Sequence, residues 1–175
     1  MTDKEIHSLY KHPKISALLA LPHGEGYGLP IFEAAYSGLP VVATGWSGHL
    51  DFLIDENKKE HFYNVSFDMQ PVQKEVVWEN VLIAESMWAY PREQSSKEKM
   101  RECYEDLTSK EKAAATKLAA ENYANVLKNK FSPQKMYTSF IRKFHDNDAN
   151  SVKLDHCSSV IFKYLQFVKK LHKFH

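Results

Sequence analysis

The sequence lacks several features that would assign a function at once. It has only two cysteines, Cys103 and Cys157, in different segments and without a CxxC spacing, so neither a disulfide framework nor a zinc site is predicted. Its longest apolar run, residues 15–21, is far shorter than the roughly 20 residues that span a bilayer, and its polar N-terminus has no secretory signal. The 23 basic and 22 acidic residues nearly balance, which argues against a general nucleic-acid-binding protein. We therefore expect a soluble, cytoplasmic protein.

Glycine is also scarce, and its distribution is informative. All six glycines fall within residues 24–48. The whole chain has 43% hydrophobic and 13% aromatic residues, which is typical of a folded domain and not of a disordered chain. The unusual backbone geometry that this protein needs is therefore expected within that one segment.

Three apolar segments predict the strands of a parallel sheet. Residues 15–21 and 40–44 are nearly continuous apolar runs, typical of strands that are buried on both faces. Residues 61–67 are expected to form a third strand, with helices over 30–37 and 49–54 between the strands. This alternation predicts an α/β fold, a partial Rossmann-like parallel sheet of about three strands with flanking helices.

The remaining segments are predicted to be helical. Thr2 and Glu5 have the spacing of a capping box that opens a short helix. From Glu79 onward the pattern turns helical, with residues 88–91 as a connector. Further helices are expected over residues 95–106, 108–130 (opened by a capping box at Thr108 and Glu111), 132–144 and 158–174, so that the C-terminal part is all helical.

Three consecutive parts are expected along the chain. Residues 1–91 would form the Rossmann-like core, and residues 92–145 the trailing helices of the same domain. Residues 146–175 would form a polar linker and a basic amphipathic helix over 158–174, where lysines oppose an apolar face. Such a helix can contact an anionic membrane surface peripherally. The alternative, which we prefer, is a helix packed across the sheet with its lysines outward.

The loop over residues 22–28 has the chemistry of a site for a phosphorylated ligand. Three glycines at alternating positions precede a helix N-terminus, where backbone amides can face phosphate groups. Glu25 lies in this loop and Glu33 about one turn into the helix. A carboxylate in the phosphate cradle, together with the G-x-G-x-G spacing, counts against a nicotinamide or flavin site. A nucleotide-sugar, with diols on either side of a diphosphate, would suit donors flanked by two glutamates.

Residues 25–44 closely resemble a motif of a known enzyme family. The segment EGYGLPIFEAAYSGLPVVAT is similar to the E-x(7)-E region of group 1 (family 4) retaining glycosyltransferases of the GT-B fold. The usual form of that region is EGFGLPxxEAxxxGxPVVA, and the glutamates, glycines and prolines are all in register. The resemblance extends over residues 2–144, since WAYP at 88–91 is similar to the family's tryptophan-proline connector and KFS at 130–132 to the start of its terminal helix.

The resemblance implies a donor site for a nucleotide-activated hexose. Glu33 would bind the ribose diol, and Glu25, implied to be catalytic, would bind a hydroxyl of the donor sugar. Transfer would retain the anomeric configuration and need no metal or other cofactor, because amides and basic side chains would neutralise the leaving diphosphate. Asp51 stands where the family commonly has Glu. The candidate donor-binding residues are His23, Gly24, Glu25, Gly26, Tyr27, Gly28, Leu29, Glu33 and Gly48.

Simpler roles for the same residues stay open. Glu25 and Glu33 can be a solvated loop carboxylate and a carboxylate favoured by the helix dipole, His23 an ordinary loop histidine, and Tyr27 a packing aromatic with only its backbone at the site. Asp146 and Asp148 have the spacing of a metal-binding D-x-D motif, but they follow a helix in a polar linker. Two other functions are conceivable: a non-catalytic pseudoenzyme or interaction subunit derived from such a domain, and, less favoured, an NAD-type dinucleotide-binding module.

The resemblance also implies that this chain is one half of a catalytic unit. A complete member of the family has two Rossmann-like domains, and the first, with the acceptor site, would precede Met1, so the chain alone is not expected to be active. Residues 15–21 have the apolar character of a central strand but would form a sheet edge here. Exposed apolar edges invite pairing with another chain. We therefore expect a separately encoded N-terminal half, or a second copy of this chain, at that strand.

Overall fold

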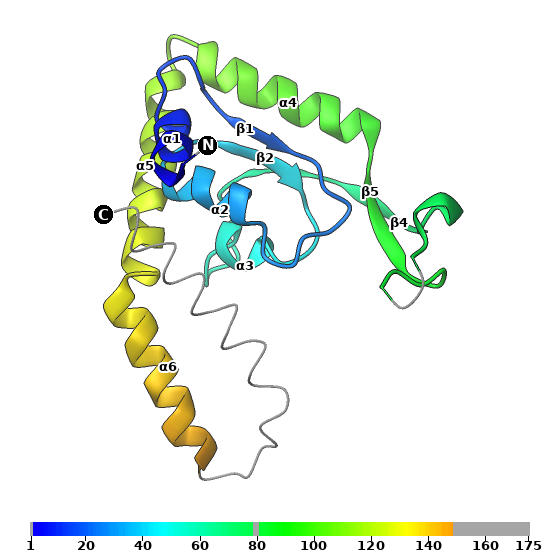
Figure 1. Cartoon of the computed structure of the whole chain (residues 1–175). Helices are drawn as coiled ribbons and strands as arrows, with labels where there is room; N and C mark the ends of the chain where they lie inside the picture. Colours follow the sequence, from blue (N-terminus) through cyan, green and yellow to red (C-terminus); the bar gives the residue numbers. More distant parts are fainter. Residues whose placement is uncertain (1, 79–80, 149–175) are drawn as a thin grey trace. The chain divides into compact units, whose positions relative to one another are not determined.

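The computed structural model describes residues 2–78 and 81–148 (Figure 1). Residues 10–124 form the larger of two compact units, and the remaining described residues, 2–9 and 125–148, belong to the second. The predicted tail helix over 158–174 lies outside the described residues. Within the described residues, no helix combines the length and apolarity needed to cross a bilayer.

Three short strands form the predicted parallel sheet. They lie in the order β1 (Leu18–Ala20), β2 (Val41–Thr44) and β3 (Tyr63–Val65), with Leu18 opposite Val41 and Val42 opposite Tyr63. All four residues of the central strand β2 are buried, as its continuous apolar run predicts. The predicted α/β fold with a three-stranded parallel sheet is confirmed, although β1 is shorter than residues 15–21.

Helices cover both faces of this sheet. Figure 1 shows α4 (Glu93–Thr108) along one side and α2 (Leu29–Tyr36) and α3 (Leu50–Leu53) along the other. On the α4 side, Val42 and Val65 pack against Cys103. The sheet is therefore a buried middle layer, which leaves the loops at its ends to form sites.

The end of α2 lies close to the predicted end of the helix at residue 37. Gly38 has a φ of 87°, a left-handed conformation that favours glycine. The Gly38 N–H donates to the carbonyl of Ala35 at 3.1 Å, and the Leu39 N–H donates to that of Ala34 at 3.0 Å. This pair of bonds is the Schellman motif, which satisfies the last carbonyls of a helix and turns the chain into β2.

The two predicted capping boxes have different outcomes. The first is confirmed, because at the start of α1 (Asp3–Tyr10) the Thr2 N–H donates to Glu5 Oε2 at 2.5 Å and the Glu5 N–H to Thr2 Oγ1 at 3.3 Å. The second is wrong, because Thr108 is the last residue of α4 and its hydroxyl donates to the carbonyl of Tyr104. The hydroxyl of Ser109 instead accepts from the N–H groups of Glu111 and Lys112. The later helices are α5 (Ala113–Lys130) and α6 (Pro133–Asp148).

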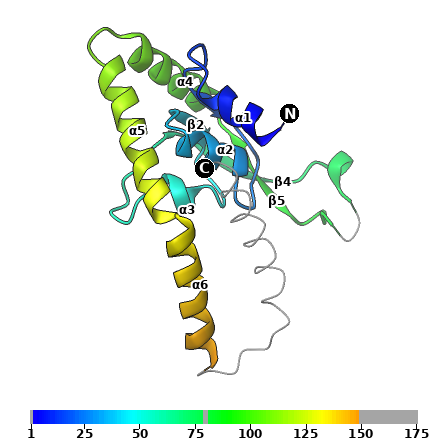
Figure 2. The ribbon, with the colours of Figure 1, turned by 60° about the vertical axis from the view of Figure 1, so that its left-hand side comes forward.

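The segment after β3 differs from the sequence prediction. The chain does not turn helical toward residues 88–91; instead β4 (Phe67–Pro71) and β5 (Met87–Pro91) form a separate antiparallel two-stranded sheet, here called the ribbon. A 3-10 helix, η1 (Lys74–Val76), lies between them. The predicted strand over 61–67 is split at Ser66. The Ser66 carbonyl accepts a hydrogen bond from the N–H of Arg92, and the Ser66 N–H donates one to the hydroxyl of Ser95. Figures 1 and 2 both show the ribbon extending away from the parallel sheet.

Candidate functional site

Two glycine-containing loops lie together at the carboxyl ends of β1 and β2. They are the first loop, residues 22–28, and the second loop, residues 45–48. The Ser47 hydroxyl accepts a hydrogen bond from the Glu25 N–H at 2.9 Å and donates one to the Glu25 carbonyl at 2.6 Å. The Gly48 N–H donates to the same carbonyl at 3.1 Å. The structure thus brings together Glu25 and Gly48, two of the predicted site residues, at the edge where α/β proteins bind ligands.

The two glycines of the second loop both have close neighbours, but only Gly48 lies against backbone. A Cβ atom on Gly48 would collide with the backbone carbonyl of Gly26, and a Cβ on Gly45 would collide with the side-chain amide of Asn64. The first loop is different, because a Cβ on Gly26 would meet nothing within 4 Å and one on Gly24 would come no closer than 3.8 Å to the Ser47 hydroxyl. Backbone packing within the described structure therefore requires Gly48, whereas a Cβ would fit at Gly24 and would meet open space at Gly26.

The first loop leads into the N-terminus of α2. Its last glycine, Gly28, is the N-cap residue with φ 79° and ψ 55°, and no side chain in the described structure caps the helix. A Cβ on Gly28 would lie 3.0 Å from Cβ of His49, so the helix begins tightly against the second loop. Leu29 at this end is 36% exposed. The first amides of α2 are thus presented beside the two loops, where the helix dipole favours an anion.

The two candidate glutamates are held by different neighbours. The backbone of Glu25 is bound by Ser47, as described, and its side chain is half-buried. Glu33 is half-buried on α2 and contacts Tyr10, the last residue of α1. Burial raises the pKa of the Tyr10 hydroxyl, and the negative charge and hydrogen bond of Glu33 raise it further. Sequence reasoning did not identify Tyr10, which the α1–β1 connection brings to Glu33.

Tyr27 belongs to an aromatic cluster. Its ring centroid lies 5.8 Å from that of Phe32 and 5.1 Å from that of Phe52, and the rings of Phe32 and Phe52 meet edge to face at 5.1 Å. Phe32 and Phe52 are each 1% exposed. The ring of Tyr27 therefore anchors the first loop to the core.

His23 connects the first loop to the ribbon. The N–H of Ala89 in β5 donates to the His23 carbonyl at 3.1 Å, and Nδ1 of His23 lies 2.9 Å from the Ala89 carbonyl oxygen. The imidazole is parallel to the ring of Trp88 at 5.0 Å and tilted against that of Tyr90 at 4.5 Å. The sequence prediction missed these β5 residues because it assigned 88–91 to a connector. The two aromatic residues Trp88 and Tyr90, a residue type that strands favour, are the signal that could have indicated a strand here, although they do not indicate its contact with His23.

A buried histidine lies beneath the second loop. His49 is fully buried, and its Nε2–H donates to the Thr44 carbonyl at 2.7 Å. Nδ1 of His49 and the hydroxyl of Thr44 have no hydrogen-bond partner within the described part of the chain. Buried polar atoms usually have partners, so these two atoms at the carboxyl end of β2 are exceptions within the described residues.

No family model, curated protein or solved structure matches the chain. Its function is therefore inferred from the two loops, their neighbours and the motif at residues 25–44. Within the described residues, no three His, Cys, Asp or Glu side chains are grouped as a metal site. Asp146 and Asp148, predicted to lie in a linker, belong to the end of α6.

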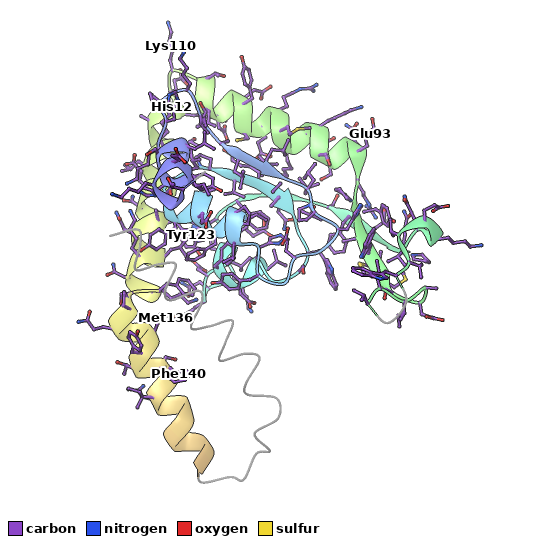
Figure 3. The ribbon with its side chains drawn as sticks, viewed as in Figure 1. His12, Glu93, Lys110, Tyr123, Met136 and Phe140 are labelled. Carbon is purple, nitrogen blue, oxygen red and sulfur yellow. The ribbon has the colours of Figure 1, made fainter. Side chains whose placement is uncertain are left out.

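A cleft of about 420 Å³ lies at the opposite, amino end of the strands, beside residues that begin β2 and β3. His61 lines it, stacked on Tyr123 of α5 at 3.6 Å, and Nε2 of His61 is 3.0 Å from Asp55 Oδ2. Tyr123, labelled in Figure 3, donates its hydroxyl to the Phe52 carbonyl at 2.8 Å. Hydrogen bonds from His61 and from the backbone of Lys59 lower the pKa of Asp55. These groups satisfy one another, as expected of a structural cluster.

Proposed function

We propose that this chain is the donor-binding part of a cytoplasmic, retaining hexosyltransferase of the GT-B type. The observation that carries the proposal is the pair of hydrogen bonds between the Ser47 hydroxyl and the backbone of Glu25, which join the two glycine loops. They lie beside the N-terminus of α2, which no side chain caps in the described structure. Open space beside Gly24 and Gly26 suits a ligand that approaches the backbone closely. The motif at residues 25–44 supplies the ligand class, a nucleotide-activated hexose.

The residues divide naturally between the parts of such a ligand. The diphosphate would lie at the N-terminus of α2, where amides of the first loop compensate its charge without a metal. Glu33, oriented by Tyr10, would accept hydrogen bonds from the ribose diol. Glu25 would bind a hydroxyl of the hexose, next to the bond that breaks when the sugar is transferred.

Transfer also requires an acceptor site, which we propose a partner supplies at the edge of the sheet. β1 is an edge strand, paired on one side with β2, and its central residue Leu19 is 51% exposed. An apolar side chain in that position suits a strand that another chain covers. The chain alone would then bind the donor and transfer nothing.

Calorimetric titration tests this function. Wild-type protein is expected to bind UDP-glucose or GDP-mannose and not NAD. Glu33→Ala should weaken that binding by about 1–3 kcal/mol, because a charged hydrogen-bond partner of the ribose is lost. Glu56→Ala, an exposed residue in the turn before β3, is the matched control and should bind as the wild type does.

Each other outcome selects a different conclusion. Unchanged affinity in Glu33→Ala would remove the ribose assignment. Binding of NAD alone would favour a dinucleotide module. Absence of binding to every nucleotide would favour an interaction subunit that is derived from such a domain.

A further inference from the structure

The imidazole of His23 is oriented by β5. A carbonyl oxygen can only accept a hydrogen bond, so the 2.9 Å contact with Ala89 places the proton of the neutral ring on Nδ1. The reciprocal bond from the Ala89 N–H holds the backbone of the same residue. Trp88, parallel to the imidazole within 4°, and Tyr90 restrict the plane of the ring. The tautomer and the orientation of His23 are thus both defined by residues of the ribbon.

The second ring nitrogen is left available to a ligand. Nε2 of His23 makes no hydrogen bond within the described residues, and it is not among their buried unpaired atoms. His23 itself is half-buried, two residues before Glu25. With the proton on Nδ1, Nε2 of the neutral ring is an acceptor only. Its complement is a group that carries a hydrogen atom to donate, such as a hydroxyl, and not an ionised phosphate oxygen.

We propose that His23 is a ligand-contacting residue whose Nε2 accepts a hydrogen bond from a hydroxyl of the donor sugar, and that Trp88 and Tyr90 are its positioning residues. The proposal rests on the function proposed above. It makes the ribbon part of the sugar-binding site. It also assigns to His23 the recognition of the hexose, and leaves the diphosphate to the amides of α2.

Two substitutions of His23 separate its two nitrogens. His23→Asn keeps an amide N–H near the position of Nδ1, so the bond to the Ala89 carbonyl can persist while the Nε2 acceptor is removed. His23→Gln places its amide oxygen or nitrogen near the position of Nε2 and gives up the bond to Ala89. Each variant is titrated with UDP and UDP-glucose, and with GDP and GDP-mannose, so that the sugar is the only difference within a pair.

The expected result is a loss confined to the sugar nucleotides. In His23→Asn, affinity for UDP-glucose or GDP-mannose should fall about 3- to 10-fold, the effect of one hydrogen bond, while affinity for UDP or GDP stays unchanged. Partial recovery in His23→Gln supports an acceptor at Nε2. An equal loss for UDP and UDP-glucose would overturn the proposal in favour of a diphosphate contact, and no loss would make His23 an ordinary loop residue. If the wild type binds none of these nucleotides, the proposed function itself fails, and the role of His23 in sugar recognition fails with it.

A measurement without ligand tests the positioning role separately. The ¹⁵N chemical shifts of the His23 ring should report the Nδ1–H tautomer in the wild type. Trp88→Leu should shift them toward a mixture of tautomers. Trp78→Leu, at a residue that is 68% exposed and is not among the described partners of the His23 ring, should leave them unchanged. A ring protonated on Nε2 in the wild type, or shifts unaffected by Trp88→Leu, would contradict the role assigned to β5.

Discussion

Ser47 is the residue on which the geometry of both loops depends. Its φ of 91° lies in the left-handed region, which costs a residue with a side chain roughly 1–2 kcal/mol. Its hydroxyl compensates by bonding both the N–H and the carbonyl of Glu25. At this position the two hydrogen bonds of the serine hydroxyl, which hold the loops together, offset the cost of the strained backbone.

This balance predicts different effects for two substitutions of Ser47. Ser47→Ala keeps the strained φ and loses both hydrogen bonds, so the free energy of unfolding should fall by about 1–3 kcal/mol. Ser47→Gly loses the same bonds but relieves the strain, and should be less destabilised than the alanine variant. Urea denaturation of both variants measures the difference. An alanine variant as stable as the wild type would show that the loops are held by other contacts.

At this scale, the sequence predicted what is local and missed what is distant. Glu25, Gly26, Gly28 and Glu33 lie in one continuous motif, residues 25–44, with a recognisable spacing. The partners of His23 and Glu33 lie outside this motif. His23 and Ala89 are 66 positions apart, and strand β1 lies between Tyr10 and Glu33 in the sequence. Neither contact leaves a periodic or compositional signal in the chain.

Among the elements, the turn that leads into β3 is organised by one carboxylate. Asp55 Oδ1 accepts the N–H groups of Asn57 and Lys59 at 2.8 and 3.0 Å, while Oδ2 faces His61. These hydrogen bonds lower the pKa of Asp55. Two other carboxyl groups also have a lowered pKa, because a basic side chain donates a hydrogen bond to each. Arg92 does so to Asp68, and Lys112 to Asp106.

A lowered carboxyl pKa implies a loss of stability in acid. Each of these groups stabilises the folded chain at pH values above the unfolded pKa of about 3.9, and that contribution disappears as the pH falls through the lower pKa of the folded state. The free energy of unfolding should therefore decrease below about pH 4. Asp55→Asn, which cannot ionise, should show a shallower decrease in urea titrations between acidic and neutral pH. An equally steep decrease in this variant would show that Asp55 contributes no pH dependence.

The positions of β2 and α2 were predicted well, because a continuous apolar run marks the strand and a following glycine marks the end of the helix, whereas the cap predicted at Thr108 was wrong. The ribbon was missed for two reasons. Its strands pair across an intervening segment with exposed apolar residues, including Trp78 and Val81, which has neither a helical nor an alternating period. Residues 61–67 also have the pattern of one strand in the sequence, although the hydrogen bonds at Ser66 divide them between two sheets.

For the molecule as a whole, the exposed edge of the parallel sheet has the greatest consequence. The described structure leaves the outer side of β1 without a neighbouring strand, and Leu19, the middle residue of β1, is 51% exposed. Natural proteins usually protect such an edge with a charged residue, a bulge or a covering element. Here the edge residues are leucine and alanine.

Self-association through β1 is the expected behaviour of the isolated chain. Light scattering at micromolar concentration should detect dimers or larger species of the wild type. Leu19→Lys, which places a charge on the edge strand, should shift the population to monomers without unfolding the protein, as circular dichroism can verify. A monodisperse wild-type monomer in the absence of any partner would contradict this prediction.

The unequal space around the glycines separates the demands of folding from those of ligand binding. Selection for a stable fold alone should keep glycine at residue 48, because a Cβ there would collide with the backbone of the first loop. The same selection would tolerate alanine at residues 24 and 26, where a methyl group has room. If orthologues from distant lineages nevertheless retain glycine at residues 24 and 26, that constraint would have to come from a molecule that lies against the first loop. Conservation at these two positions would then indicate a ligand.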